Sequence, residues 1–216
     1  MPAIGNATGI SFMKRGSLLW SLYWNTHKSI EQAEFRDLQL GTLICFNLAG
    51  FTTDSVPLGY DPDTFNPTDT DTEGWINEWL DTCVDAGITY AILTVKSHEG
   101  FCLWPTLSCA PGYDPYSIAQ SSWYSLNGNP DILSLFCDAC RSRGIKVGIY
   151  WSVYDLTYES RTGCDSTGLN AAQSEAYINF NKVQLNELCR NYGIIDIFWI
   201  DGWGWHMPYT ENAGIP

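Results

Sequence analysis

One unit recurs three times in this chain and constrains its fold more than any other feature. A segment with helical periodicity ends at a glycine, and an apolar, strand-like run follows at once. The glycines are Gly87, Gly144 and Gly193, and the runs are residues 88–95, 145–151 and 194–203. Helices that feed directly into buried strands, repeated in this way, predict a parallel sheet with helical connections.

Two of the helices carry recognisable start residues. Thr70 and Glu73 fit a capping box at the start of the first helix. Asn129 and Pro130 fit an N-cap and first-turn pair at the start of the second. The third helix is expected at about residues 174–192. A further strand, residues 40–46, precedes the first helix and brings the predicted strands to four.

The connections after the strands are long, whereas those before them are short. This asymmetry is typical of a (β/α)8-type, TIM-like barrel with elaborated loops at the C-terminal ends of its strands. A doubly wound α/β sheet would share the alternation, but no glycine-rich nucleotide-binding motif follows any strand. Because a closed barrel needs eight strands in roughly 250 residues, we expect about the first four βα units, at residues 36–216. Residues 1–35 are expected to form an N-terminal arm or attachment segment.

Composition argues against several kinds of partner. The 216 residues carry a formal net charge of −13 without a Lys/Arg cluster, which argues against nucleic acid and anionic membranes. No apolar run is long enough for a membrane span. No convincing signal peptide is visible, so the location of the protein is not predicted. The oligomeric state is not predicted either. Ten Trp and twelve Tyr fit carbohydrate stacking and equally fit an aromatic core. His27, His98 and His206 lack metal-ligand spacing, so no metal and no cofactor are predicted.

The eight cysteines do not form a tight disulfide framework, and most are interpreted as reduced, small apolar residues. Cys102 and Cys109 are candidates for a loop disulfide if the protein is exported. Cys137 and Cys140 form a lone C-x-x-C within a helical segment. Without a second pair or a nearby His, this motif favours packing over zinc or redox chemistry.

Polar side chains follow three of the predicted strands, where the carboxyl ends of parallel strands meet at one rim. They are Lys96, Ser97, His98 and Glu99 after the second strand, Trp151, Tyr154 and Asp155 after the third, and Asp201 after the fourth. A carboxylate, an imidazole and aromatic groups on one rim suit glycoside hydrolysis, whose transition state is stabilised by nearby negative charge. The residues alone leave a capping role open for Asp201 and a structural role open for His98. For Glu99 and Asp155 they favour caps or loop charges.

Three segments also carry a family resemblance. Residues 93–105, Leu-Thr-Val-Lys-Ser-His-Glu-Gly-Phe-Cys-Leu-Trp-Pro, resemble the Lys-His-His-Asp-Gly-Phe-x-Leu-Trp signature of α-L-fucosidases, glycoside hydrolase family 29. Residues 144–152 resemble that family's third strand, and residues 198–202 resemble its Trp-x-Asp-Gly nucleophile strand. The family consists of retaining exo-glycosidases on a (β/α)8-like barrel. The resemblance therefore implies a carbohydrate partner, a fucosylated or related glycan.

The resemblance also implies roles for individual residues. Asp201 stands at the position of the nucleophile, and His98 at that of a residue that binds fucose hydroxyls. Trp104, Trp151 and Trp199 are implied to face the sugar.

The chain departs from the family pattern at three substrate-binding positions. Cys45 and Ser97 replace histidines, and the Glu-Trp that follows the family's first strand has no clear counterpart in residues 51–57. The family's acid/base lies beyond the nucleophile strand, in sequence that this chain does not contain. Each lost hydroxyl contact removes on the order of 1–3 kcal/mol of substrate discrimination. We therefore expect a retaining glycosidase that is truncated and has low activity on its own. The alternative is a non-catalytic carbohydrate-binding or structural module on a degenerate barrel.

Overall fold

The computed structural model describes residues 29–52, 59–163 and 171–202. The chain divides into two compact units, residues 1–39 and 40–216. In the first unit, helix α2 (Ile30–Asp37) begins at Ser29, which forms a capping box with Gln32. Most of the predicted arm, residues 1–28, lies outside the described residues.

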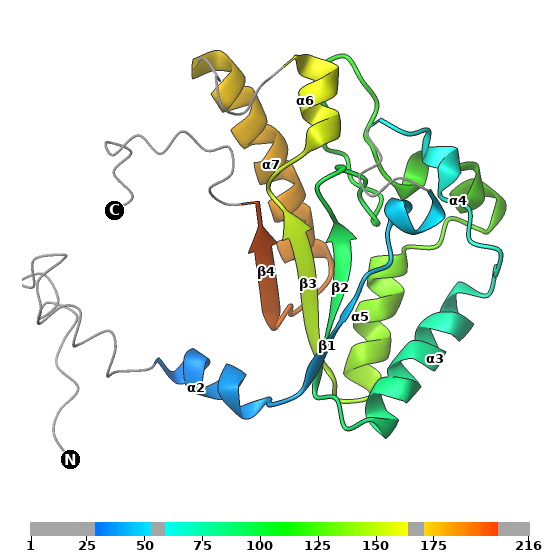
Figure 1. Ribbon diagram of the computed structural model, residues 1–216, viewed down its shortest axis with the longest axis vertical. Helices are drawn as coiled ribbons and strands as arrows, with labels where there is room; N and C mark the ends of the chain where they lie inside the picture. The colour runs from blue at the N-terminus through cyan, green and yellow to red at the C-terminus, as the bar shows by residue number, and fades with distance from the viewer. Residues whose placement is uncertain (1–28, 53–58, 164–170, 203–216) are drawn as a thin grey trace, which may run out of the picture. The chain divides into compact units, whose positions relative to one another are not determined.

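The second unit is built on a parallel sheet (Figure 1). Its described strands are β1 (Gly41–Ile44), β2 (Tyr90–Lys96), β3 (Lys146–Ser152) and β4 (Ile197–Asp201), and they lie in the order β1-β2-β3-β4. All three neighbouring pairs are parallel. The four predicted strands are thus confirmed. Their sequential order is that of a β/α barrel, because a doubly wound sheet reverses its strand order at a switch point.

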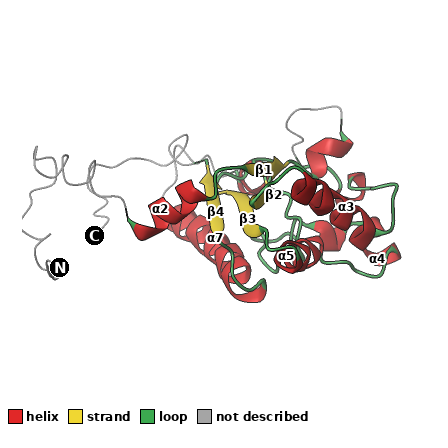
Figure 2. Cartoon of the chain, turned by 90° about the horizontal axis from the view of Figure 1, so that it is seen from below, coloured by secondary structure: helices red, strands yellow, loops and turns green. Residues whose placement is uncertain are grey.

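Three long helices connect the strands and lie on one face of the sheet (Figure 2). They are α3 (Thr72–Asp85), α5 (Ile132–Ser142) and α7 (Ala171–Asn191). The long connections after the strands hold five short elements: η2 (Leu48–Phe51), η3 (Pro62–Thr64), η4 (Ile118–Gln120), α4 (Ser122–Leu126) and α6 (Leu156–Thr162). Among the described residues, no helix combines the length and apolarity needed to cross a bilayer.

Helices α3 and α5 begin later than the sequence predicts. The N-cap of α3 is Asp71, whose carboxylate accepts a backbone N–H in the first turn, so the predicted capping box at Thr70 is wrong. The N-cap of α5 is Asp131, which accepts from the N–H of Ser134, whereas Asn129 adopts a left-handed conformation with φ of 60°. An aspartate caps as well as Thr or Asn does, and its charge is also favourable at the positive end of the helix.

The core between the sheet and the helices is apolar and closely packed. It includes the fully buried side chains of Leu80, Leu93, Val95, Phe136 and Ile149. Cys137 and Cys140 are part of this core on α5, and burial raises the pKa of each thiol to about 12. Both cysteines therefore act as small apolar residues, which confirms their predicted packing role.

Candidate active site

Asp201 is the last residue of β4 and lies at the C-terminal rim of the sheet. One carboxylate oxygen, Oδ2, accepts from the Tyr150 hydroxyl at 2.5 Å, and the other accepts from the backbone N–H of Gly202 at 2.7 Å. These hydrogen bonds, that of Tyr150 foremost, hold the pKa of Asp201 below its ordinary value. The side chain is 46% exposed. An ionised, accessible and oriented carboxylate suits nucleophilic attack.

Tyr150 is the residue of this site that the sequence analysis missed. It lies opposite Trp199 in the β3–β4 register, with the two rings 5.6 Å apart. Burial, followed by the bond to Asp201, raises the pKa of its phenol, so Tyr150 stays a proton donor. No local signal in the sequence could have revealed it, because the register that places Tyr150 on the same face as Trp199 and Asp201 is set by strand pairing.

His98 follows β2, which is separated from β4 by β3, and it approaches Asp201 across the end of β3. Its Nε2 lies 3.9 Å from Asp201 Oδ2, and its Nδ1 lies 2.7 Å from Ser152 Oγ at the end of β3. The order Ser, His, Asp is that of a hydrolase triad. However, Ser152 is fully buried, and its hydroxyl donates to the carbonyl of Tyr154 at 2.8 Å. The Ser152 hydroxyl is thus buried and engaged, whereas the Asp201 carboxylate is accessible.

A buried ion pair lies behind this rim. Lys96 Nζ is 2.9 Å from Asp155 Oδ2, and the two side chains are 0% and 3% exposed. Lys96 also donates to Gln184 of α7 at 3.2 Å. Asp155 caps α6 through the N–H of Tyr158, which confirms the predicted capping role. The pair ties the end of β2 to the segment after β3.

Glu99 lies in the turn after β2, in agreement with its interpretation as a loop residue, but its side chain is buried. Its side chain accepts from the hydroxyl of Ser97, and its Oε1 has no hydrogen-bond partner. Burial raises the pKa of Glu99. Glu99 is therefore easier to protonate than an exposed glutamate, and it is only 1% exposed.

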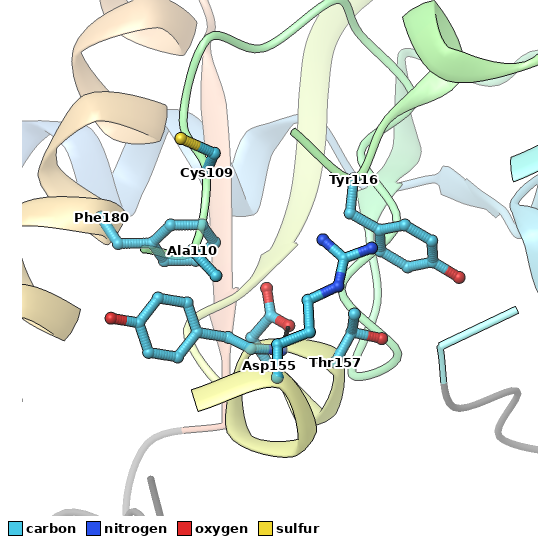
Figure 3. A pocket seen from close by; sticks show the side chains of 8 residues that line it. Cys109, Ala110, Tyr116, Asp155, Thr157 and Phe180 are labelled. Atoms are coloured by element: carbon cyan, nitrogen blue, oxygen red, sulfur yellow. Dashed lines mark hydrogen bonds between the residues drawn. The ribbon is translucent and has the colours of Figure 1, made fainter. Parts of the chain in front are cut away.

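A small pocket lies next to Asp155 (Figure 3). Cys109, Ala110 and Tyr116 line it from the segment after β2, and Phe180 lines it from α7. Its volume is about 10 Å³, which is room for about one water molecule. The pocket is therefore too small for a sugar.

The predicted disulfide between Cys102 and Cys109 is wrong, because both thiols are free. Cys109 is exposed at the pocket, whereas Cys102 is buried. Cys102 Sγ lies 3.6 Å from the carbonyl of Gly100 and 3.5 Å from Nε2 of Gln184. Within the part of the chain that the structure describes, no group of three or more His, Cys, Asp and Glu side chains could hold a metal ion.

Comparison with known proteins decides the family. The family model described as alpha-L-fucosidase matches residues 24–214. The chain belongs to the α-L-fucosidase family. Alpha-L-fucosidase 1 of Arabidopsis thaliana is 33% identical over 168 residues, which cover 76% of this chain and 29% of that protein. Tissue alpha-L-fucosidase of Homo sapiens is 28% identical over 163 residues, or 74% of this chain and 32% of that protein.

Solved α-L-fucosidase structures share the fold. A glycoside hydrolase 29 family member from an unknown rumen bacterium superposes with a TM-score of 0.62 at 32% identity, over 81% of this chain and 28% of that one. An α-L-fucosidase of Bacteroides thetaiotaomicron was solved as a trapped covalent intermediate with 2-fluoro-fucosyl fluoride. It superposes with a TM-score of 0.60 at 26% identity, over 82% of this chain and 42% of that one. The chain spans about a third of the length of the curated relatives that it matches. The four strands thus form part of a TIM-like α-L-fucosidase barrel, as predicted.

The family resemblance placed three tryptophans against the sugar, and for two of them the structure overturns this. Trp104 and Trp151 are 0% and 1% exposed. Their ring N–H groups donate to Glu187 at 2.9 Å and to Gln184 at 3.0 Å, both on α7. The two rings therefore anchor the rim to a helix. Trp199, in contrast, is 46% exposed beside Tyr150.

Cys45 and Ser97 stand where the α-L-fucosidase pattern has histidines. Cys45 is exposed directly after β1. Ser97 is half-buried and donates to Glu99. Their contribution to substrate binding stays a prediction, as does that of His98.

Proposed function

We propose that residues 36–216 are the N-terminal part of the catalytic barrel of a retaining α-L-fucosidase, with Asp201 as nucleophile and a fucosylated or related glycan as substrate. The observation that carries the proposal is the state of Asp201. It is ionised by its bonds to Tyr150 and Gly202, accessible, and next to His98 at the carboxyl end of a barrel strand. Nucleophiles of barrel enzymes occupy this position. Residues 1–35 are proposed to be an arm outside the barrel.

The reaction that we infer has two steps. In the first, a carboxylate oxygen of Asp201 bonds to the anomeric carbon while the bond to the leaving oxygen breaks, which gives a glycosyl ester of Asp201. In the second, water attacks the same carbon and releases the carboxylate. A second carboxylate, about 5–5.5 Å away in retaining enzymes, protonates the leaving oxygen and then activates the water. Glu99 and Asp155 are buried and engaged, so neither is placed for this task.

The proposal is tested by trapping the intermediate on the 216-residue chain. The probe is 2-deoxy-2-fluoro-fucosyl fluoride, whose fluoride departs without protonation, so that the acid/base is not needed. We expect a single adduct by intact mass, located on Asp201 by peptide mapping and absent in Asp201→Ala. The matched control is Asp196→Asn, which alters a carboxylate at the far end of the same strand, bonded to Lys146, and should leave the adduct unchanged.

A folded chain that forms no adduct would overturn the assignment of Asp201. The alternative, which the comparisons do not favour, is a module that binds the sugar without reacting. That module would bind fucose in equilibrium dialysis and form no adduct.

A further inference from the structure

The buried hydroxyl of Ser152 makes three hydrogen bonds at the end of β3. It donates to the carbonyl of Tyr154 at 2.8 Å and accepts from the backbone N–H of the same residue at 3.1 Å. The third partner is His98 Nδ1 at 2.7 Å. A hydroxyl has one proton to donate. With that proton directed at the carbonyl of Tyr154, which can only accept, Ser152 would face His98 as an acceptor.

We propose that Ser152 is a positioning residue that fixes the tautomer of His98. An accepting hydroxyl requires the proton of the neutral imidazole to be on Nδ1, which leaves Nε2 as an acceptor. Nε2 is the nitrogen that faces Asp201. The backbone of His98 is also held in place, because the N–H of Leu156 donates to the carbonyl of His98 at 2.9 Å.

The tautomer determines how His98 Nε2 interacts with Asp201 and with a bound ligand. Nε2 and Asp201 Oδ2 are both acceptors, 3.9 Å apart, so together they select a ligand group that brings its own proton, such as a sugar hydroxyl. The other tautomer would direct an N–H at Asp201, which already accepts from Tyr150. A further donor would stabilise the carboxylate and weaken it as a nucleophile. In this respect the inference rests on the proposed function.

The tautomer is measured directly by long-range 1H–15N correlation on the 15N-histidine-labelled chain. The spectra are recorded at about pH 8, where an unperturbed imidazole is neutral, and His98→Gln identifies the signals. We expect a protonated Nδ1 and a bare Nε2 in the unchanged chain. In Ser152→Ala, the Nε2-protonated form should gain population. A protonated Nε2 in the unchanged chain, or the same tautomer in Ser152→Ala, would overturn the proposal.

The matched control is Ser117→Ala. Ser117 is also fully buried, and its hydroxyl likewise accepts a backbone N–H, at 3.3 Å, and donates once. Loss of that hydroxyl should leave the His98 spectrum unchanged, while both variants should have similar unfolding midpoints. A change in the His98 spectrum in both variants would mean that general loosening moves the tautomer, and it would overturn the specific role of Ser152.

A kinetic measurement separates this inference from the proposed function. Covalent labelling by the fluoro-fucosyl fluoride should be about tenfold slower in Ser152→Ala, by analogy with the loss of a group that orients a metal-bound histidine, and unchanged in Ser117→Ala. If the unchanged chain shows the expected tautomer but is never labelled, the nucleophile assignment fails and the role of Ser152 stands. Equal labelling rates despite a changed tautomer would overturn the link between Ser152 and reactivity.

Discussion

Tyr150 has the largest influence on the charge state of Asp201, because its hydrogen bond is the main cause of the lowered pKa of that carboxyl. Tyr150→Phe removes the bond and keeps the ring. We expect the pKa of Asp201 to rise toward its ordinary value. The nucleophile would then be protonated at a higher pH, so the acid limb of the labelling rate should move to higher pH. A pH profile of adduct formation measures the shift.

Tyr124→Phe is the control for this profile, since Tyr124 lies on α4, away from Asp201. Its profile should coincide with that of the unchanged chain. An unmoved acid limb in Tyr150→Phe would show that the bond to Gly202 is enough to keep Asp201 ionised.

Glu99 predicts a pH dependence of stability with a definite sign. In the unfolded chain a glutamate titrates near 4.5, and burial raises the pKa of Glu99 above that in the fold. Between the two values the folded state binds the proton more tightly, so stability falls as the pH rises through this window. Glu99→Gln removes this loss. We expect urea unfolding to show that the variant gains stability relative to the unchanged chain as the pH rises above 4.5.

An exposed glutamate provides the reference for this measurement. Glu78→Gln, on the outer side of α3, should leave the stability difference constant across the same range. If the stability difference between Glu99→Gln and the unchanged chain is also constant with pH, the carboxylate of Glu99 is ionised in the fold and interacts with the Lys96 ammonium.

At the scale of elements, the Lys96–Asp155 pair joins β2, α6 and α7. Asp155→Asn keeps an acceptor for the cap of α6 but leaves the ammonium buried without a counter-charge. Breaking a buried pair from one side typically costs about 3–5 kcal/mol of unfolding free energy. Asp138→Asn breaks the exposed pair with Arg141, whose aspartate is 75% exposed, and should cost less than about 1 kcal/mol. Equal losses of unfolding free energy in the two variants, measured by urea unfolding, would mean that the buried pair stabilises the fold no more than the exposed pair does.

The strands and helices were predictable because their signals are local. Each glycine that ends a helix and each apolar run stand next to one another in the chain, so the parallel sheet followed from the order of the segments. The helix starts were less certain, since Asp71 and Asp131 compete with good capping residues just before them. That competition is settled by backbone geometry, which the sequence does not display.

The site was predictable only in part, because burial on both faces hides which way a strand residue points. Asp201 and His98 follow strands, and the structure brings them together. Tyr150 and Trp151 are adjacent aromatics on a strand buried almost throughout, so no polar alternation distinguishes them. The resemblance favoured Trp151, whereas Tyr150 contacts Asp201. The contacts of Trp104 with Glu187 join residues 83 positions apart and have no local signature.

At the scale of the whole sheet, one face differs from the other. Helices α3, α5 and α7 lie on one side (Figure 2). The strand register places Leu43 of β1 in one row with Ile92, Gly148 and Ile197, which is the face of Asp201. Leu43 is 40% exposed there. Within the described strands, β1 and β4 each pair on one side alone. Exposed apolar side chains next to unpaired strand edges favour association.

This asymmetry predicts that the 216-residue chain self-associates through its sheet. Sedimentation velocity should show a mass that increases with concentration, and Leu43→Lys should reduce the increase because a charge on an edge strand opposes pairing. Leu126→Lys is the matched control: Leu126 is 82% exposed, but it ends α4 and has no strand neighbour, so the same charge should have little effect. A chain that stays monomeric, or two variants that respond equally, would show that general surface hydrophobicity and not the open sheet controls association.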